Sequence, residues 1–165
     1  MADYPVCEVF YTEAGWVAVL LSEKGLKRLT LPQTTATEAR KLLGTEATGN
    51  PDLIKDTASR LTKYLSGKKI PFPEILDLSE ATPFQRRVWE ITRQIPYGET
   101  QSYKWVASRL GKENAARAVG QALGRNPIPI IIPCHRVLAS NGSLGGYSGG
   151  LEMKRFLLKL EAGRS

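Results

Sequence analysis

The chain has 165 residues, 42% hydrophobic and 24% charged, with 15 Gly, 10 Pro, 2 Cys and 1 His, which is typical of a soluble globular protein of one domain or two small ones. It contains no apolar run near the roughly 18 residues that span a bilayer, and its first ten residues lack the basic and apolar segments of a secretion signal. We therefore expect neither a membrane protein nor a secreted one. Two cysteines, Cys7 and Cys134, are too few for a disulfide framework, so we expect a reducing compartment.

The net charge of +7 comes entirely from the carboxy-terminal half. Residues 1–78 carry 10 basic and 10 acidic side chains, whereas residues 79–165 carry 13 basic and 6 acidic ones. Such an excess predicts a polyanionic partner, a nucleic acid, for that half. A solubilising surface charge is the alternative, and the charge alone favours neither.

The first third of the chain alternates as strands do, over residues 6–12, 16–22 and 26–31, with turn formers between them. This pattern predicts an antiparallel meander. Two helical segments follow, a short one at 37–43 and a longer one at 51–66. The next ten residues are rich in proline and predict a connector, so we place a domain boundary at about residue 78.

Two helices are predicted at the start of the carboxy-terminal half. Residues 82–85, Thr-Pro-Phe-Gln, form a capping box that predicts a helix over 82–94. We expect Thr100 to cap a second helix that reaches Leu110, and Gly111 to end it.

A third helix is expected over 114–123, almost directly after the second. Its small residues lie on one face: Ala115, Ala118, Val119 and Ala122. Two short helices joined by a tight turn predict a helix-turn-helix that presents Arg117, with a plain helical hairpin as the alternative.

The segment 126–138 is too proline-rich for a helix and too apolar for a surface loop, so it predicts buried, extended backbone. Glycine-rich turns follow, and 151–161 has the pattern of a closing amphipathic helix.

Cys134 and His135, the only histidine, stand side by side and suggest nucleophilic chemistry. A cysteine attacks as its thiolate, so the site needs a base or a positive neighbour that lowers the thiol pKa, and Arg136 would add such a charge. A carboxylate would have to orient the imidazole, and Glu161 is one candidate. An inert buried cysteine remains the alternative. One histidine and no CxxC pair argue against a zinc site.

Residues 132–137, Ile-Pro-Cys-His-Arg-Val, closely resemble the active-site motif of the O6-alkylguanine-DNA alkyltransferases, also called methylated-DNA-protein-cysteine methyltransferases. Three further segments match the family in order and spacing: Ala116 to Gly120, Asn126-Pro127, and Gly145 to Gly150. The resemblance covers residues 80–161 and is by position only in the amino-terminal half.

The resemblance implies an α/β (α+β) fold in two domains. Residues 1–78 would form an antiparallel sheet with helices, and residues 79–165 a helical, winged-helix-like domain that binds DNA and carries out catalysis. The small face of the helix at 115–122 would approach the minor groove of duplex DNA.

The resemblance also implies roles for individual residues. Cys134 would take the alkyl group from O6 of a flipped guanine, His135 would accept the thiol proton through a water, and Glu161 would orient His135. Arg117 would fill the gap left in the base stack, and Tyr103 would displace a phosphate and offer its hydroxyl to the base. The other expected residues are the DNA contacts Thr100, Ala118 and Gln121, the hinge Asn126, and the pocket residues Pro129, Val137, Tyr147 and Ser148.

The implied protein is a monomer without cofactor or metal, which acts once per molecule because a thioether is not hydrolysed. It would act in the cytoplasm, or in the nucleus of a eukaryote, on O6-methylguanine, with O4-alkylthymine as a further candidate substrate. The length leaves no room for a further regulatory domain. Two alternatives stay open: a lesion-binding protein without transfer, and a thiol hydrolase or acyltransferase, which the basic half and Arg117 disfavour.

Overall fold

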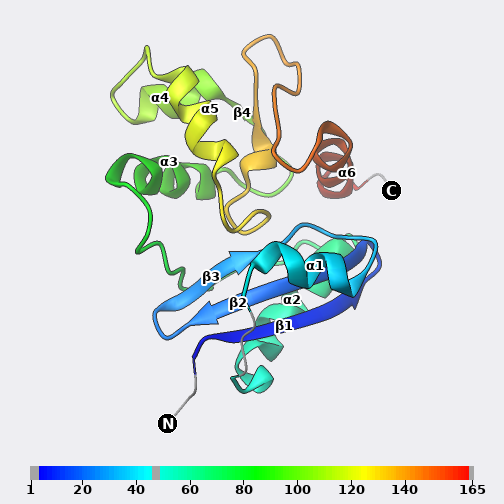
Figure 1. Ribbon diagram of the computed structural model, residues 1–165. Helices are drawn as coiled ribbons and strands as arrows, with labels where there is room; N and C mark the ends of the chain where they lie inside the picture. Colours follow the sequence, from blue (N-terminus) through cyan, green and yellow to red (C-terminus); the bar gives the residue numbers. More distant parts are fainter. Residues whose placement is uncertain (1–3, 46–48, 164–165) are drawn as a thin grey trace. The chain divides into compact units, whose positions relative to one another are not determined.

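A computed structural model of the chain describes residues 4–45 and 49–163 (Figure 1). The first three residues, part of the stretch considered for a secretion signal, lie outside the described residues. The chain divides into two compact units, Met1–Leu78 and Ser79–Ser165. Within the described part of the chain, no helix combines the length and apolar character needed to cross a membrane.

The first unit contains a three-stranded antiparallel sheet. Strands β1 (Val6–Thr12), β2 (Gly15–Ser22) and β3 (Gly25–Leu29) lie in the order β1-β2-β3. The register of β1 and β2 runs without a shift from Val6↔Leu21 to Thr12↔Gly15. The predicted meander is therefore confirmed, because alternating apolar residues and glycine-containing turns specify hairpins locally.

Helices cover this sheet on both faces. Helix α1 (Ala36–Leu43) lies in front of it and α2 (Lys55–Leu65) behind it in Figure 1. Four consecutive residues of β2, at positions 17–20, are buried, as a strand covered on both faces requires. The predicted helix over 51–66 begins instead as a 3₁₀ turn, η1 (Pro51–Ile54), in which the Asn50 side chain accepts a hydrogen bond from the N–H of Asp52.

Helix α3 (Pro83–Arg93) begins the second unit and has the predicted capping box, with the hydrogen bonds in both directions between Thr82 and Gln85. Its buried Trp89 donates a hydrogen bond from Nε1 to the carbonyl oxygen of Ala122 at 2.9 Å. This bond ties α3 to the helix that lines the cavity described below.

Helix α4 (Tyr103–Arg109) begins later than the sequence predicted. A short strand, β4 (Gln101–Ser102), precedes it and pairs in parallel with β5 (Val137–Leu138). Ser102, whose side chain accepts a hydrogen bond from a backbone N–H of the first turn at 2.9 Å, is the cap. The prediction that Thr100 caps this helix is wrong, because pairing with β5 keeps the two intervening residues extended.

Helix α5 (Ala116–Gly124) begins two residues after the predicted position and packs against α3 and α4. Its small-residue face points inward: Val119 and Ala122 are buried, and Ala118 is half-buried. The expectation that this face as a whole approaches DNA is therefore wrong for Val119 and Ala122. The small side chains instead allow α5 to lie close to its two neighbours.

The segment between α5 and the Cys134 turn is buried, as predicted, but it is not extended. Ile128, Ile130, Ile131 and Ile132 are at most 4% exposed. The N–H of Ile132 bonds the carbonyl of Ile128 at 2.9 Å, and Ile130 has a left-handed backbone with φ of 75°. The chain turns tightly here because packing of the isoleucines outweighs the local preference of a β-branched residue.

Helix α6 (Leu151–Glu161) closes the unit with the bounds that the sequence predicted. Its inner side carries Lys154, Leu157 and Glu161, all buried. Two of these three are charged, which an amphipathic pattern alone does not predict.

Candidate active site

Cys134 begins a 3₁₀ turn, η2 (Cys134–Arg136), and is 5% exposed. Its Sγ accepts a hydrogen bond from Nδ2 of Asn126 at 3.1 Å. The same Nδ2 donates to the carbonyl of Ile132 at 2.8 Å, while Oδ1 accepts from the N–H of Ile128 at the same distance. One amide side chain thus fixes both the buried loop and the sulfur.

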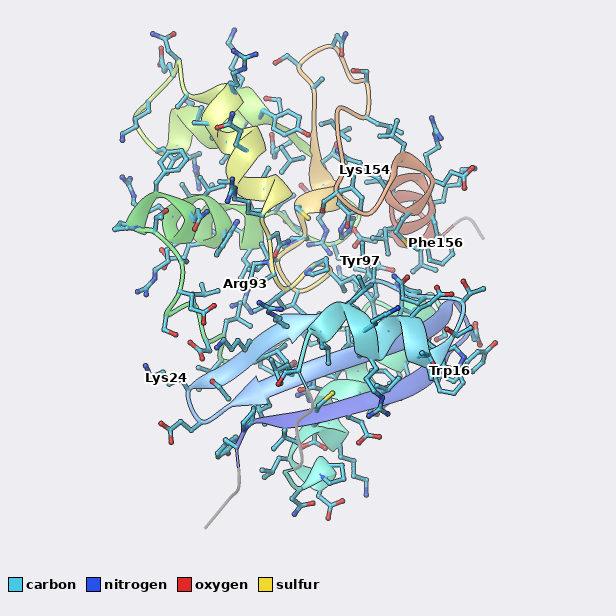
Figure 2. All side chains as sticks on the ribbon, in the orientation of Figure 1. Trp16, Lys24, Arg93, Tyr97, Lys154 and Phe156 are labelled. Atoms are coloured by element: carbon cyan, nitrogen blue, oxygen red, sulfur yellow. The ribbon has the colours of Figure 1, made fainter. Side chains whose placement is uncertain are left out.

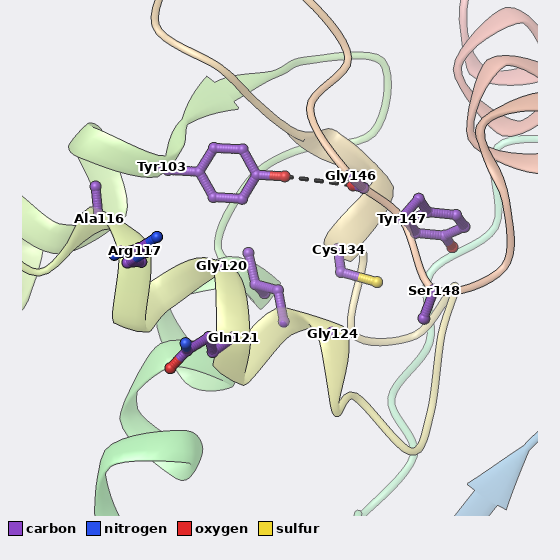
Figure 3. A pocket seen from close by; sticks show the side chains of 11 residues that line it. Tyr103, Ala116, Arg117, Gly120, Gln121, Gly124, Cys134, Gly146, Tyr147 and Ser148 are labelled. Carbon is purple, nitrogen blue, oxygen red and sulfur yellow. Dashed lines mark hydrogen bonds between the residues drawn. The ribbon is translucent and has the colours of Figure 1, made fainter.

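The sulfur faces a cavity of about 470 Å³, within the size range of small-molecule sites (Figure 3). Helix α5 forms one wall, the start of α4 another, and the glycine-rich loop 145–150 a third. The residues that line it are Tyr103, Ala116, Arg117, Gly120, Gln121, Leu123, Gly124, Cys134, Gly146, Tyr147 and Ser148.

Tyr103 lies between two glycines. Its hydroxyl donates a hydrogen bond to the carbonyl of Gly146 at 3.4 Å (Figure 3). A Cβ at Gly145, where φ is +68°, would lie 2.8 Å from the Tyr103 hydroxyl oxygen and 3.0 Å from its Cε2. A Cβ at Gly120 would lie 3.8 Å from the ring. The absence of side chains at both positions lets the tyrosine fill this space.

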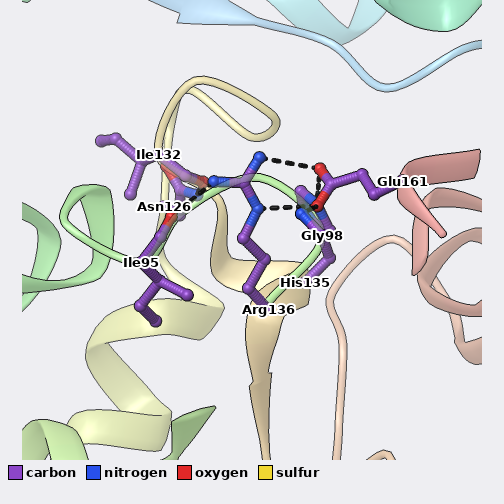
Figure 4. A network of polar contacts seen from close by, with 7 residues as sticks. All are labelled: Ile95, Gly98, Asn126, Ile132, His135, Arg136 and Glu161. Atoms are coloured by element: carbon purple, nitrogen blue, oxygen red, sulfur yellow. Dashed lines mark hydrogen bonds and ion pairs between the residues drawn. The ribbon is translucent and has the colours of Figure 1, made fainter. Parts of the chain in front are cut away.

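On the far side of the turn, three buried polar side chains form a connected network (Figure 4). Nε2 of His135 lies 2.7 Å from Oε2 of Glu161. Arg136 holds the same carboxylate with two bonds, Nε to Oε1 at 2.8 Å and Nη2 to Oε2 at 2.9 Å. Because Nε2 is engaged by Glu161, Nδ1 is the ring nitrogen that remains for the thiol proton.

The electrostatics at the sulfur differ from the expectation of a lowered thiol pKa. Burial raises the pKa of Cys134, and the hydrogen bond from Asn126 and the charge of Lys154 only partly oppose this. Burial also lowers the pKa of His135, against the effect of Glu161. Arg136 is not the positive neighbour of the thiol, because its guanidinium is bound to Glu161. Burial therefore favours the uncharged form of both side chains, the thiol and the neutral imidazole.

Lys154 is the site residue that the sequence analysis missed (Figure 2). Its ammonium donates to the carbonyls of Val137 at 2.8 Å, of Gly146 at 3.2 Å, and of Leu144. These bonds tie α6 to β5 and to the loop that lines the cavity. Burial lowers the pKa of Lys154 to about 8, and the nearby Cys134 opposes this shift. The sequence did contain a signal for this role. Lys154 lies three residues before Leu157 and seven before Glu161, on the apolar face of the predicted helix, where a charged residue is unexpected.

The structure brings six of the expected site residues together around the cavity: Tyr103, Arg117, Gln121, Cys134, Tyr147 and Ser148. His135, Glu161 and Asn126 lie behind it, in the contacts described above. Four expected residues are not among those that line it: Thr100, Ala118, Pro129 and Val137. Thr100 is exposed, Pro129 is half-buried, and Val137 is fully buried with its carbonyl bonded to Lys154.

Comparison with known proteins agrees with this geometry. The family model described as 6-O-methylguanine DNA methyltransferase, DNA binding domain, matches residues 83–163. The methylated-DNA--protein-cysteine methyltransferase of Methanosarcina barkeri is 42% identical over 154 residues, 93% of this chain and 95% of the relative. That of Mycobacterium bovis is 47% identical over 121 residues, 73% of each chain.

Among solved structures, the chain resembles Mycobacterium tuberculosis OGT in complex with DNA, with a TM-score of 0.80 and 39% identity. The match covers 96% of this chain and 94% of that one, and so includes both units. The expected α+β fold class, with its antiparallel three-stranded sheet, is confirmed. The chain belongs to the methylated-DNA–protein-cysteine methyltransferase family.

Proposed function

We propose that the chain repairs DNA by direct reversal, transferring the alkyl group of O6-alkylguanine irreversibly to Cys134. The observation that carries this proposal is the position of the sulfur, which faces a cavity large enough for a small ligand, with a buried acid–base network behind it. The alternative of lesion binding without transfer is not favoured, because the relatives that match most of the chain are named methylated-DNA--protein-cysteine methyltransferases.

In the reaction, the sulfur of Cys134 attacks the carbon attached to O6, so that an S–C bond forms and the C–O6 bond breaks. The thiol proton passes through a water to His135, which Glu161 orients. The departing guanine takes up a proton from the hydroxyl of Tyr103, and the proton held by His135 returns through water to the Tyr103 oxygen, so that both side chains end uncharged. Hydrogen on sulfur is thus exchanged for alkyl, without metal or cofactor, and the stable thioether limits each molecule to one reaction.

We assign DNA binding and catalysis to residues 79–165, which carry the whole excess of positive charge. Arg117 is exposed at the cavity and is suited to enter the minor groove and replace the flipped base. Tyr103 and Gln121 line the same cavity and face the same partner. Thr100 and Ala118 complete the proposed DNA contacts.

The flipped base would lie against Tyr147 and Ser148, which line the cavity wall opposite α5. Pro129 and the backbone of Val137 would complete the pocket. The Val137 carbonyl already accepts a hydrogen bond from Lys154 and would accept one from the base with its second lone pair. Asn126, which bonds both the loop and the sulfur, is suited to be the hinge between α5 and the active-site turn.

We propose that the protein acts as a monomer in the cytoplasm, or in the nucleus of a eukaryote, because its substrate is DNA and its nucleophile must remain a reduced thiol.

Intact mass spectrometry after mixing with a short duplex containing one O6-methylguanine tests the proposal. We expect the mass to increase by one methyl group per protein, on Cys134, in the wild type and in Cys7→Ala, but not in Cys134→Ala. Tight lesion-dependent binding without a mass change would overturn the transfer and support a binding protein. Repeated turnover of a thioester without DNA would support the hydrolase alternative.

A further inference from the structure

We propose that Arg136 is a positioning residue that keeps His135 uncharged before transfer, by neutralising the carboxylate that the two side chains share. The inference rests on the proposed function for the role of His135 as the base. Its physical content, the charge state of one buried imidazole, can be measured without any reaction.

The geometry makes Arg136 the main partner of Glu161. The guanidinium meets both carboxylate oxygens edge to edge, at 2.8 and 2.9 Å, and its remaining arm, Nη1, donates to the carbonyl of Ile95 at 2.7 Å. The backbone N–H of Gly98 donates to Oε1 of the same carboxylate at 3.2 Å. Arg136 is 9% exposed, Glu161 7% and His135 0%, so solvent screens these charges little.

Counting the buried charges shows why the arginine matters. With Arg136 present, the guanidinium and the Glu161 carboxylate already sum to zero, and a proton on His135 would add an uncompensated charge. Without Arg136, the carboxylate is the uncompensated charge, and a proton on His135 restores neutrality at a distance of 2.7 Å. Removing a positive side chain should therefore make the histidine positive.

Other ionisable groups near His135 do not reverse this balance. Lys154, from α6, is a cation and further disfavours a proton on the ring, as does burial. The remaining neighbours on the adjoining segments, Cys134, Tyr97 and Tyr147, all have raised pKa values and are neutral at pH 7. The lowered pKa of His135 agrees with this arrangement, since Arg136 is among its causes.

The consequence for the reaction follows from the proton path. A neutral imidazole can accept the thiol proton, whereas an imidazolium paired with Glu161 cannot. Arg136 therefore keeps the base available until the sulfur attacks.

His135 is the only histidine, so NMR of protein labelled with ¹⁵N-histidine reports its protonation state and tautomer from one pair of signals. We expect a neutral ring at pH 7 in the wild type and in Arg136→Lys, which retains a charge, and an imidazolium in Arg136→Met. The rate of methyl transfer by Arg136→Met should fall at least tenfold at pH 7 and recover as the pH rises toward 9. Affinity for a lesion-free duplex should stay within twofold, because Arg136 is buried.

An imidazolium at pH 7 in the wild type would overturn the proposal outright. This measurement is made on the wild-type protein and so does not depend on whether a variant folds. A neutral ring in Arg136→Met, or a rate reduced by the same factor at every pH, would also overturn it by leaving a purely structural role. If the wild type transfers no methyl group, the proposed function fails, while the charge-state result remains valid by itself.

Discussion

Replacing Gly145 with alanine should impair transfer through Tyr103 and not merely destabilise the loop. An alanine at φ of +68° costs roughly 1–2 kcal/mol, of which about 0.4–1 kcal/mol is offset by a less flexible unfolded chain. The new Cβ would also lie 2.8 Å from the Tyr103 hydroxyl oxygen, so the tyrosine must move. A shift of the ring away from the new Cβ breaks the hydrogen bond of the Tyr103 hydroxyl to Gly146, which is already 3.4 Å long.

Gly142→Ala is the matched control, because Gly142 has φ of +84° and its Cβ would meet no atom within 4 Å. Both variants should lose about 1 kcal/mol of unfolding free energy in urea. Gly145→Ala should lose about 1 kcal/mol more, the typical value of a hydrogen bond and its packing. Its single-turnover transfer rate should fall about tenfold, corresponding to about 1.4 kcal/mol in the barrier. Equal stability and equal rates in the two variants would refute the steric argument.

Trp89→Phe removes the Nε1 donor to the carbonyl of Ala122, which keeps only the bond from the N–H of Arg125 at 3.2 Å, and should cost about 0.5–1.5 kcal/mol of unfolding free energy, measured in urea; a change under 0.5 kcal/mol would contradict the role of this bond. Ser102→Ala should cost about 1 kcal/mol in the same assay because it removes a cap, whereas Thr100→Ala should cost less than half of that. The pKa of His135 is lower in the folded than in the unfolded chain, so below pH 6.5 the unfolded chain binds the extra proton. The unfolding free energy should therefore fall on acidification by up to about 1.4 kcal/mol per pH unit, and His135→Gln should lack this component.

The elements of the first unit could be predicted because their signals are local. Alternation and turn glycines indicate hairpins, and a capping residue such as Asn50 indicates where a helical segment begins. The capping box at 82–85 and the pattern of α6 are signals of the same kind. Such features depend on neighbours within a few residues, so sequence reasoning could find them.

The corrections concern positions that contacts distant in the sequence decide. Pairing of β4 with β5 moved the cap from Thr100 to Ser102. Burial raises the pKa of Cys134, where the sequence predicted a lowered one. The guanidinium of Arg136 binds Glu161 and therefore does not stabilise the thiolate. These outcomes depend on which side chains meet across the fold, and no spacing along the chain encodes that.

Ile130, which has φ of 75° four residues before the nucleophile, forms the turn that leads into Cys134 and so helps to set the position of its sulfur. A left-handed β-branched residue costs of order 1–3 kcal/mol, whereas burying its side chain is worth about 1.5–3 kcal/mol, to which the buried Ile128, Ile131 and Ile132 add. The turn is thus set by tightly packed isoleucines and not by its own backbone preference. Cys134 is therefore preorganised, because the buried turn and the Asn126 bond restrict the sulfur during folding, and less entropy is lost when a substrate enters.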